Sequence, residues 1–311
     1  MRVKKVYPVP SHTCAHHNNH MKILLLGKNG QVGYELQRTL APLGEVTALG
    51  RQELDLTDTL AIRSAVRTTK PDLIVNAAAY TAVDKAESEP ELAMAVNGTA
   101  PGILAEEAAL ANAYLVHYST DYVFDGTKTT PYTEEDTPNP VNTYGKSKLA
   151  GEEAIISTGC RHLILRTSWV YSLRGSNFLL TILRLAAERD ELSIVNDQHG
   201  APTWSRMIAE ATALIIATAR AYKRAEGIYH LTATGETTWH GFATAIINQA
   251  ATRGLLASKP ALKAISSADY QTAAQRPKNS LLNCSALYNT YGIKLPDWGT
   301  SLDLALDEHK A

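Results

Sequence analysis

Short aliphatic runs alternate with longer amphipathic segments along the chain from Met21 onward. The first run, Lys22–Leu26, is apolar and ends at a glycine, which is typical of a buried strand in a parallel sheet. Gly30–Leu40 follows with apolar residues at helical spacing and stops before Pro42. The same alternation continues and predicts strands at 46–49, 73–75, 114–118 and 163–165, and helices at 57–68, 91–113 and 144–156.

Strands and helices that alternate at this rhythm form right-handed crossovers, so we expect a Rossmann-type α/β fold with a doubly wound parallel sheet. After about Trp169 the rhythm loosens and polar, proline-containing loops become common. Helices are predicted there at 177–189, 206–223 and 239–252, with strands at 192–195 and 228–231. We interpret this half as a smaller C-terminal α/β domain that covers the carboxyl edge of the sheet.

The composition excludes several classes of protein. Of 311 residues, 45% are hydrophobic and 20% charged, which is a globular composition rather than a disordered one. Thirty basic residues against 31 acidic ones give a formal charge of −1, so the chain lacks the excess of positive charge that binds nucleic-acid phosphates. No apolar run reaches the roughly 18 residues of a membrane span, and three distant cysteines predict a reducing, cytoplasmic location.

The first twenty residues differ from the rest of the chain. They contain two prolines and no periodic pattern, and they lack the apolar core of a secretory signal. The histidines and Cys14 in this segment could hold a stray divalent ion, but no predicted element fixes their geometry. We therefore expect residues 1–20 to be a flexible extension.

A glycine-rich loop, Gly27-Lys28-Asn29-Gly30-Gln31-Val32-Gly33, joins the first strand to the first helix. Such a loop needs glycine for a tight turn and for close approach of the backbone to a pyrophosphate, which the helix N-terminus then binds. We therefore expect residues 21–169 to form a dinucleotide-binding domain. Residues 170–311 then form mainly the substrate-binding domain, with the chain able to cross back between the two.

The end of the second strand bears on the choice of cofactor. NAD-binding folds usually carry an acid there for the ribose hydroxyl, but this chain has Gly50 and Arg51. An arginine can pair with the 2′-phosphate of NADPH through its planar guanidinium. NADPH is therefore favoured, while Glu53 and Asp55 nearby keep NADH as the alternative.

Three residues form a candidate catalytic set. Thr120 ends the fourth strand, and Tyr144 and Lys148 lie four residues apart on one face of the following helix. An ammonium beside a tyrosine stabilises the phenolate and is expected to lower the pKa of Tyr144. The set suits protonation of a carbonyl oxygen while a nicotinamide delivers hydride to its carbon.

The order of these motifs resembles that of the extended short-chain dehydrogenases/reductases. The glycine loop is followed by Asn-Ala-Ala-Ala (76–79), Ser-Thr-Asp (119–121) and the Tyr144/Lys148 pair. Within that superfamily, longer blocks resemble the dTDP-4-dehydrorhamnose reductases: 75–93, 117–126, 144–152, 166–171, 196–203 and 276–283.

The resemblance implies roles for individual residues. Tyr144 would be the proton donor, Lys148 its activator and a ribose ligand, and Thr120 the second partner of the carbonyl. The cofactor pyrophosphate would contact Gly30, Gln31 and Val32. The adenine end of the cofactor would contact Asp55 and Leu56. The middle part of the cofactor would contact Ala79, Tyr80 and Thr81. The nucleotide sugar would contact Asp121, Trp169, Asn177, the turn at 200–203 and Arg276.

The resemblance also raises the question of whether this chain binds a divalent metal ion. Some relatives hold a divalent ion such as Mg²⁺ among glutamates at a dimer interface, and Glu35 and Glu308 lie at matching places. Arg206 stands where another acid is expected, which leaves a weaker site for a hard cation. We therefore expect no metal site, and a homodimer remains an open alternative.

The resemblance implies NADPH-dependent reduction of the carbon-4 ketone of dTDP-4-dehydro-L-rhamnose, the last step of dTDP-rhamnose synthesis for cell-surface polysaccharide such as O-antigen. Two alternatives remain at this point. One is a non-catalytic regulatory subunit, because relatives of this family regulate methionine adenosyltransferase. The other is a reductase of a related nucleotide ketosugar, since the pocket rather than the fold decides the substrate.

Overall fold

The structure, a computed structural model, describes residues 20–222 and 226–309. The expected flexible extension therefore lies outside the described residues, apart from His20 at its end. Within the described ranges, no helix is both long and apolar enough to cross a membrane.

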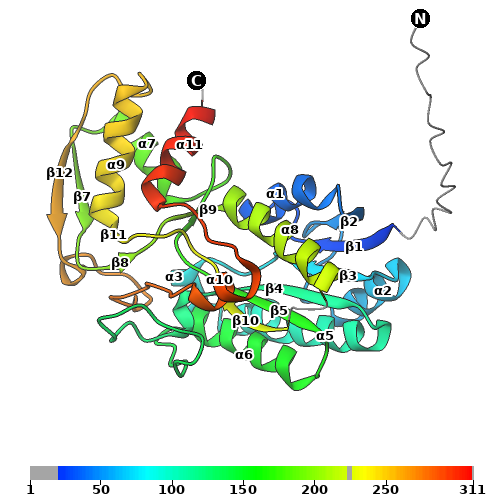
Figure 1. Ribbon diagram of the computed structural model, residues 1–311. Coiled ribbons are helices and arrows are strands. Elements are labelled where there is room, and N and C mark those ends of the chain that lie inside the picture. Colours follow the sequence, from blue (N-terminus) through cyan, green and yellow to red (C-terminus); the bar gives the residue numbers. More distant parts are fainter. Residues whose placement is uncertain (1–19, 223–225, 310–311) are drawn as a thin grey trace, which may run out of the picture.

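A parallel sheet lies at the centre of the molecule (Figure 1). In the described part of the chain six strands build it in the order β10-β5-β4-β3-β1-β2, and each neighbouring pair is parallel. The order reverses between β1 and β3, and folds of this kind bind ligands in a crevice at the carboxyl ends of the strands beside such a reversal. The expected α/β class is confirmed. The strands are β1 (Met21–Leu26), β2 (Gly44–Leu49), β3 (Leu73–Asn76), β4 (Tyr114–Thr120), β5 (His162–Thr167) and β10 (Gly227–His230).

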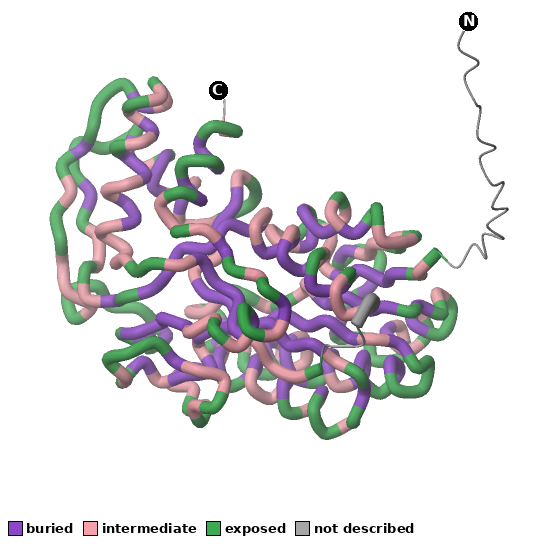
Figure 2. Tube along the Cα trace, in the orientation of Figure 1, coloured by how far each residue is buried: buried purple, intermediate pink, exposed green. Residues whose placement is uncertain are grey.

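Helices cover both faces of the sheet, and the strands between them are buried (Figure 2). Alternate residues of β1 point to opposite faces of the sheet. Ile23 packs in the core with helices α1 and α8, whereas Leu24 packs in the core with α2, α5 and α6. This is why the strand reads as a continuous apolar run rather than an alternating one. The helices are α1 (Gln31–Leu40), α2 (Thr59–Thr69), α5 (Ala100–Ala111), α6 (Thr143–Ser157) and α8 (Ser205–Tyr222).

The single helix expected at 91–113 is wrong in detail. The structure has α4 (Pro90–Met94), a π-helical turn η1 (Ala95–Thr99) and then α5. Pro101 has no N–H to donate to the carbonyl of Asn97, so the regular helical ladder is interrupted at this point. A short helix α3 (Val83–Ala86), which the pattern did not indicate, precedes them.

The second half of the chain contributes to two cores. Helix α8 packs on α1, and β10 extends the central sheet beside β5, so the chain crosses back after residue 170. A separate core lies around Phe242 and Ile246 of α9, with α7, α11 and the parallel pair β7–β12 (Figure 1). These elements are α7 (Phe178–Glu188), α9 (Trp239–Thr252), α11 (Trp298–Glu308), β7 (Glu191–Val195) and β12 (Ala261–Ile265).

Short elements complete the connection between the halves. They are η2 (Asp121–Val123), β6 (Val170–Tyr171), β8 (His199–Gly200), β9 (Thr203–Trp204), β11 (Thr237–Thr238), η3 (Ser267–Asp269) and α10 (Ser285–Tyr291). Strand β6 pairs with β9, and β8 pairs with β11.

A buried ion pair joins strand β5 to helix α6. The Arg166 guanidinium on β5 donates to both carboxylate oxygens of Glu152 on α6, at 2.9 and 2.6 Å, and both side chains are at most 2% exposed. The pair joins the helix that carries Tyr144 and Lys148 to the central sheet.

Glu152→Gln is therefore expected to destabilise the protein by about 3–5 kcal/mol, because it leaves the Arg166 charge buried without a counter-charge. Urea unfolding followed by circular dichroism measures the loss. Glu153→Gln on the exposed face of the same helix is the matched control, with an expected change within about 0.5 kcal/mol. Equal stability of Glu152→Gln and wild type would contradict the prediction.

Candidate active site

The glycine loop is shaped by close backbone contact between β1 and β3. Gly27 has φ +82°, and a Cβ there would lie 2.6 Å from the amide nitrogen of Ala78. A Cβ on Gly33 would lie 2.0 Å from the carbonyl oxygen of Gly27. Both positions therefore need glycine, and the loop folds tightly onto the start of α1.

The N-terminus of α1 is open toward this crevice. Gly30 caps the helix without a side-chain hydrogen bond, so the first helical amides, from Gln31 to Gly33, can face an anion. The buried Oε1 atom of Gln31 finds no hydrogen-bond partner among the described residues. These features fit a pyrophosphate group at the position where the sequence predicts one.

The residues after β2 surround the expected ribose position. Arg51 is exposed at the rim. Glu53 accepts hydrogen bonds from the Gly50 amide at 2.8 Å and from Lys28 Nζ at 2.7 Å. The Lys28 ammonium and the Gly50 amide hold the pKa of the Glu53 carboxyl below its usual range. Glu53 therefore closes the loop against the glycine turn and leaves Arg51 available for a phosphate.

Asp55 and Leu56 have structural roles in addition to their predicted ones. The Asp55 carboxylate accepts from the Thr57 amide and hydroxyl, each at 2.9 Å, which lowers its pKa. Leu56 is buried in the core beneath the sheet. Their contact with an adenine ring stays a prediction.

The segment after β3 is fixed by a residue that the sequence analysis missed. Asn97 of η1 accepts from the Tyr80 amide at 2.8 Å and donates to the Tyr80 carbonyl at 3.0 Å. It also donates to Ser147 Oγ on α6 at 3.0 Å. Asn97 thus holds the loop with Ala79 and Thr81 beside the catalytic helix, and no periodic signal marked it.

Thr120 and Tyr144 come together at the carboxyl end of β4. Thr120 is buried, and its hydroxyl donates to Asp121 Oδ1 at 2.9 Å. The Tyr144 ring packs edge-on against Tyr122, with ring centroids 5.6 Å apart. Asn142 caps α6 by accepting from the Gly145 amide at 2.8 Å, which fixes the first turn that carries Tyr144.

The pKa of Tyr144 does not fall as expected. Burial raises the pKa of Tyr144 above its ordinary value, and a hydrogen bond with Thr120 only partly opposes this. Lys148 Nζ instead donates to the Tyr118 carbonyl at 2.7 Å and lies 3.2 Å from His117 Nε2. A tyrosine that keeps its proton at neutral pH is suited to donate it.

Asp121 lies directly beneath these groups. The residue is 3% exposed, and burial raises the pKa of its carboxyl to about 6, opposed by hydrogen bonds with Ser280 and Thr120. Asp121 thus titrates close to the physiological range and next to the predicted carbonyl position. Its contact with a nucleotide sugar remains a prediction.

Trp169 is held in an unusual conformation. Its φ is +48°, and its ring stacks on Trp239 with centroids 3.5 Å apart. A Cβ on Gly200 would lie 2.4 Å from this ring, so the predicted turn at 200–203 packs directly on Trp169. Trp239, which the sequence analysis did not single out, lines the large cavity described below.

Asn177 caps α7. Its side-chain oxygen accepts from the Leu180 amide, and its nitrogen donates to the carbonyls of Ser172 and Arg174. The amide is thus occupied by the fold, and a substrate contact at Asn177 stays a prediction.

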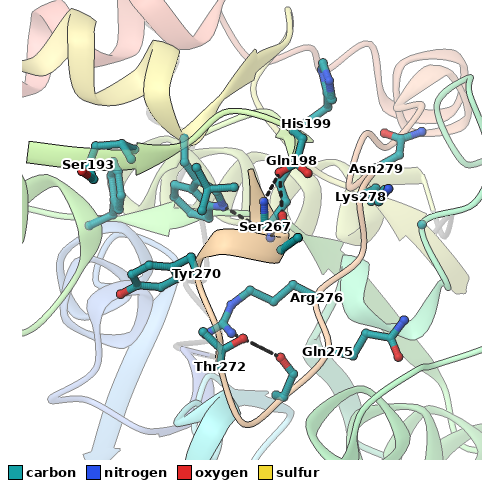
Figure 3. A pocket seen from close by; sticks show the side chains of 18 of the residues that line it. Ser193, Gln198, His199, Ser267, Tyr270, Thr272, Gln275, Arg276, Lys278 and Asn279 are labelled. Carbon is teal, nitrogen blue, oxygen red and sulfur yellow. Dashed lines mark hydrogen bonds between the residues drawn. The ribbon is translucent and has the colours of Figure 1, made fainter. Parts of the chain in front are cut away.

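A cavity of about 1760 Å³ lies between the loop at 125–129, α7, β7 and the segment 267–281. Figure 3 shows Arg276 extending into it between Tyr270 and Thr272. The guanidinium donates to both oxygens of Asp84 on α3, at 3.1 and 2.7 Å. Asn142 donates to the Gln275 carbonyl at 2.8 Å, so the loop that carries Arg276 is tied to the start of the catalytic helix.

The residues matching a metal site form ion pairs instead. Arg206 donates to Glu35 at 3.3 Å and also bonds Glu308. Within the described ranges, no group of three or more histidine, cysteine or acidic side chains is placed to hold a metal. Glu35 is paired with both Arg38 and Arg206, and Glu308 with Arg206, so these two carboxylates do not fit a divalent cation.

The glycine loop before α1, the Thr120/Tyr144/Lys148 set and the parallel sheet define an oxidoreductase of the short-chain dehydrogenase/reductase type. The profile of the family described as RmlD substrate binding domain matches residues 21–311. Curated dTDP-4-dehydrorhamnose reductases of Burkholderia thailandensis and Salmonella typhimurium are 50% and 47% identical, covering 92% and 93% of this chain and 98% of each relative. The chain belongs to the dTDP-4-dehydrorhamnose reductase family.

Solved structures agree with this assignment. The Bacillus anthracis dTDP-4-dehydrorhamnose reductase in complex with NADP superposes with a TM-score of 0.85 at 33% identity, covering 93% of this chain and 99% of that one. The Clostridium acetobutylicum dTDP-4-dehydrorhamnose reductase gives a TM-score of 0.86 at 36% identity, with the same coverage.

The ion pairs of Arg206 generate a test. Chelation with EDTA is expected to leave the thermal unfolding midpoint unchanged, since a guanidinium neutralises Glu35 and Glu308. Arg206→Gln is expected to lower the midpoint by roughly 2–4 °C for each kcal/mol lost. Arg184→Gln, which breaks an exposed pair with Glu188, is the control. A midpoint that falls with EDTA and recovers with Mg²⁺ would contradict the interpretation.

Proposed function

We propose that this chain reduces the carbon-4 ketone of dTDP-4-dehydro-L-rhamnose with NADPH to give dTDP-L-rhamnose. The observation that carries the proposal is the set at the end of β4, where Thr120 and Lys148 are buried and the Tyr144 hydroxyl forms a hydrogen bond with Thr120. The names of the curated relatives support the substrate, and the NADP complex of the Bacillus anthracis enzyme supports the cofactor. The same names favour a catalytic role over a regulatory one.

The cofactor site is built from the α1 terminus and the loops after β2 and β3. Amides from Gln31 to Gly33 hold the pyrophosphate, and the Arg51 guanidinium pairs with the 2′-phosphate. When bound, NADPH supplies the hydride to carbon 4 of the sugar. Lys148, buried next to Tyr144, positions the ribose side of this site.

Tyr144 completes the reduction by donating its Oη proton to the ketone oxygen. The developing alkoxide is a stronger base than the phenolate, so the proton moves from Tyr144 to the sugar oxygen. The Thr120 hydroxyl donates to Asp121, and rotation about its C–O bond redirects that proton to the same oxygen. The product is the alcohol, and Tyr144 regains its proton from solvent.

The nucleotide sugar occupies the cavity that Arg276 enters; Trp239 lines this cavity and stacks on Trp169. Asp84 accepts from Nη1 and Nη2 of Arg276 and fixes the guanidinium, so its remaining edge, with the Nε–H, can donate to a diphosphate. Further parts of the proposal are a cytoplasmic location, which the free thiols of Cys160 and Cys284 support, and a homodimer as the alternative to a monomer.

NADPH oxidation with the dTDP-ketosugar, compared with its GDP and UDP analogues, tests the proposal. Turnover with the dTDP-sugar should exceed turnover with either analogue. A preference for a GDP- or UDP-ketosugar would show that the proposed substrate is wrong. If NADPH is not oxidised with any ketosugar, the proposed function is rejected.

Tyr144→Phe is expected to lower kcat by about 10²–10⁴-fold, because it removes the proton donor and keeps the ring. NADPH binding, measured by fluorescence, should remain. Tyr122→Phe is the matched control, since this neighbouring ring packs edge-on against Tyr144 and the variant should keep a normal kcat. Near-normal kcat in Tyr144→Phe would place the proton donor elsewhere.

Arg276→Lys is expected to raise the KM for the dTDP-sugar about ten- to a hundredfold and to leave NADPH affinity unchanged. Lysine keeps the charge but loses the two-pronged geometry, and one charge-assisted hydrogen bond is worth roughly 1.5–3 kcal/mol. Steady-state kinetics with each ligand varied in turn measures both constants, with Arg184→Lys outside the cavity as control. A loss confined to NADPH would move Arg276 to the cofactor site.

A further inference from the structure

A row of three buried polar side chains runs beneath the catalytic tyrosine. Asn76 ends β3, His117 stands opposite it on β4, and Lys148 reaches in from α6. Each is at most 1% exposed. Asn76 Nδ2 lies 3.1 Å from His117 Nδ1, and His117 Nε2 lies 3.2 Å from Lys148 Nζ. The mechanism above assigns no role to Asn76 or His117.

The direction of the hydrogen bonds in this row follows from its first member. The Ala78 amide donates to Asn76 Oδ1 at 3.2 Å, which turns the Nδ2 group of Asn76 toward His117. An amide nitrogen only donates, so His117 Nδ1 accepts. A neutral imidazole that accepts at Nδ1 carries its proton on Nε2, the atom that faces Lys148.

This polarity bears on the charge of Lys148. An ammonium has three N–H donors and no lone pair, whereas a neutral amine accepts one hydrogen bond and still donates two. His117 Nε2–H therefore matches an amine, which can also keep its bond to the Tyr118 carbonyl. Burial acts in the same direction, because it lowers the pKa of Lys148 to about 8 and that of His117 well below its ordinary value.

The charged groups around Lys148 do not reverse this preference. Glu152 on the same helix favours the ammonium, but Arg166 of β5 holds both of its carboxylate oxygens. Asp121 of η2 bonds Thr120 and Ser280. Tyr144, one helical turn before Lys148, stays neutral at physiological pH because burial raises its pKa.

We propose that Asn76 and His117 are positioning residues that orient Lys148 through His117 Nε2–H and favour its neutral amine over its ammonium. The row then sets the pH above which the enzyme loses the Lys148 charge that stabilises the Tyr144 phenolate after proton transfer. This inference rests on the proposed function for its effect on rate, and the hydrogen-bond polarity stands apart from any activity.

The polarity is tested directly by nitrogen-15 NMR of the full-length wild-type protein with labelled histidine. The His117 signal is assigned by its absence in His117→Gln. A neutral ring protonated on Nε2 between about pH 6 and 9 supports the proposal. A ring protonated on Nδ1, or an imidazolium, overturns it. This measurement needs no substrate, so it separates failure of the row from failure of the proposed function.

Asn76→Asp tests the effect on Lys148. A carboxylate accepts from His117 Nδ1–H, which moves the ring proton away from Nε2 and leaves Nε2 as an acceptor for the ammonium. The ammonium then persists to higher pH, so the alkaline limb of the kcat profile should move up by about one pH unit. NMR should show the switched tautomer.

Asn112→Asp, an exposed change at the end of α5, adds the same charge away from the row and should leave the alkaline limb in place. If Asn76→Asp switches the His117 tautomer but the alkaline limb of its kcat profile stays in place, the row does not control Lys148 and the proposal is contradicted. A limb that moves equally in both variants would assign the effect to net charge and also overturn the proposal.

Discussion

The hydrogen bond from Lys148 Nζ to the Tyr118 carbonyl is the contact on which the arrangement of the site depends. It ties the first turns of α6 to the carboxyl end of β4 at 2.7 Å, inside a region closed to water. His117 is the second partner of Lys148 Nζ, and the Arg166–Glu152 pair joins the next turn of α6 to β5. Together these contacts fix α6 against the sheet, so Tyr144 and Thr120 meet at a fixed place.

The second half of the chain is bound to this centre by charge rather than by apolar area alone. Arg276 reaches Asp84, and Arg206 bonds both α1 and α11 through Glu35 and Glu308. These contacts join the end of the chain to its nucleotide-binding half. The cavity is lined by residues of the second core, such as Ile182 and Leu192, and by the loops at 125–129 and 267–281.

Local patterns predicted the parallel sheet and the positions of Thr120, Tyr144 and Lys148, because apolar runs and helical spacing act over a few residues. They could not reveal Asn97 or His117, whose partners lie 17 and 31 residues away. The pKa of Tyr144 was wrongly predicted for a related reason. The spacing of the two residues placed the Lys148 ammonium near Tyr144. Burial of Tyr144, and the hydrogen bond that Lys148 makes to the Tyr118 carbonyl instead, determine the pKa of Tyr144. The break at η1 has a local signal in Pro101, but the contacts of Asn97 with Tyr80 and Ser147 join separate segments and no single helix displays them.

The most direct measurement is the fate of hydrogen in one turnover with NADPH that carries deuterium at its transferable position. If Tyr144 protonates the ketone oxygen while hydride reaches the carbon, NMR of the dTDP-sugar product will show one deuterium at carbon 4 and none elsewhere. Deuterium at another carbon, or an unlabelled product sugar, would contradict the account.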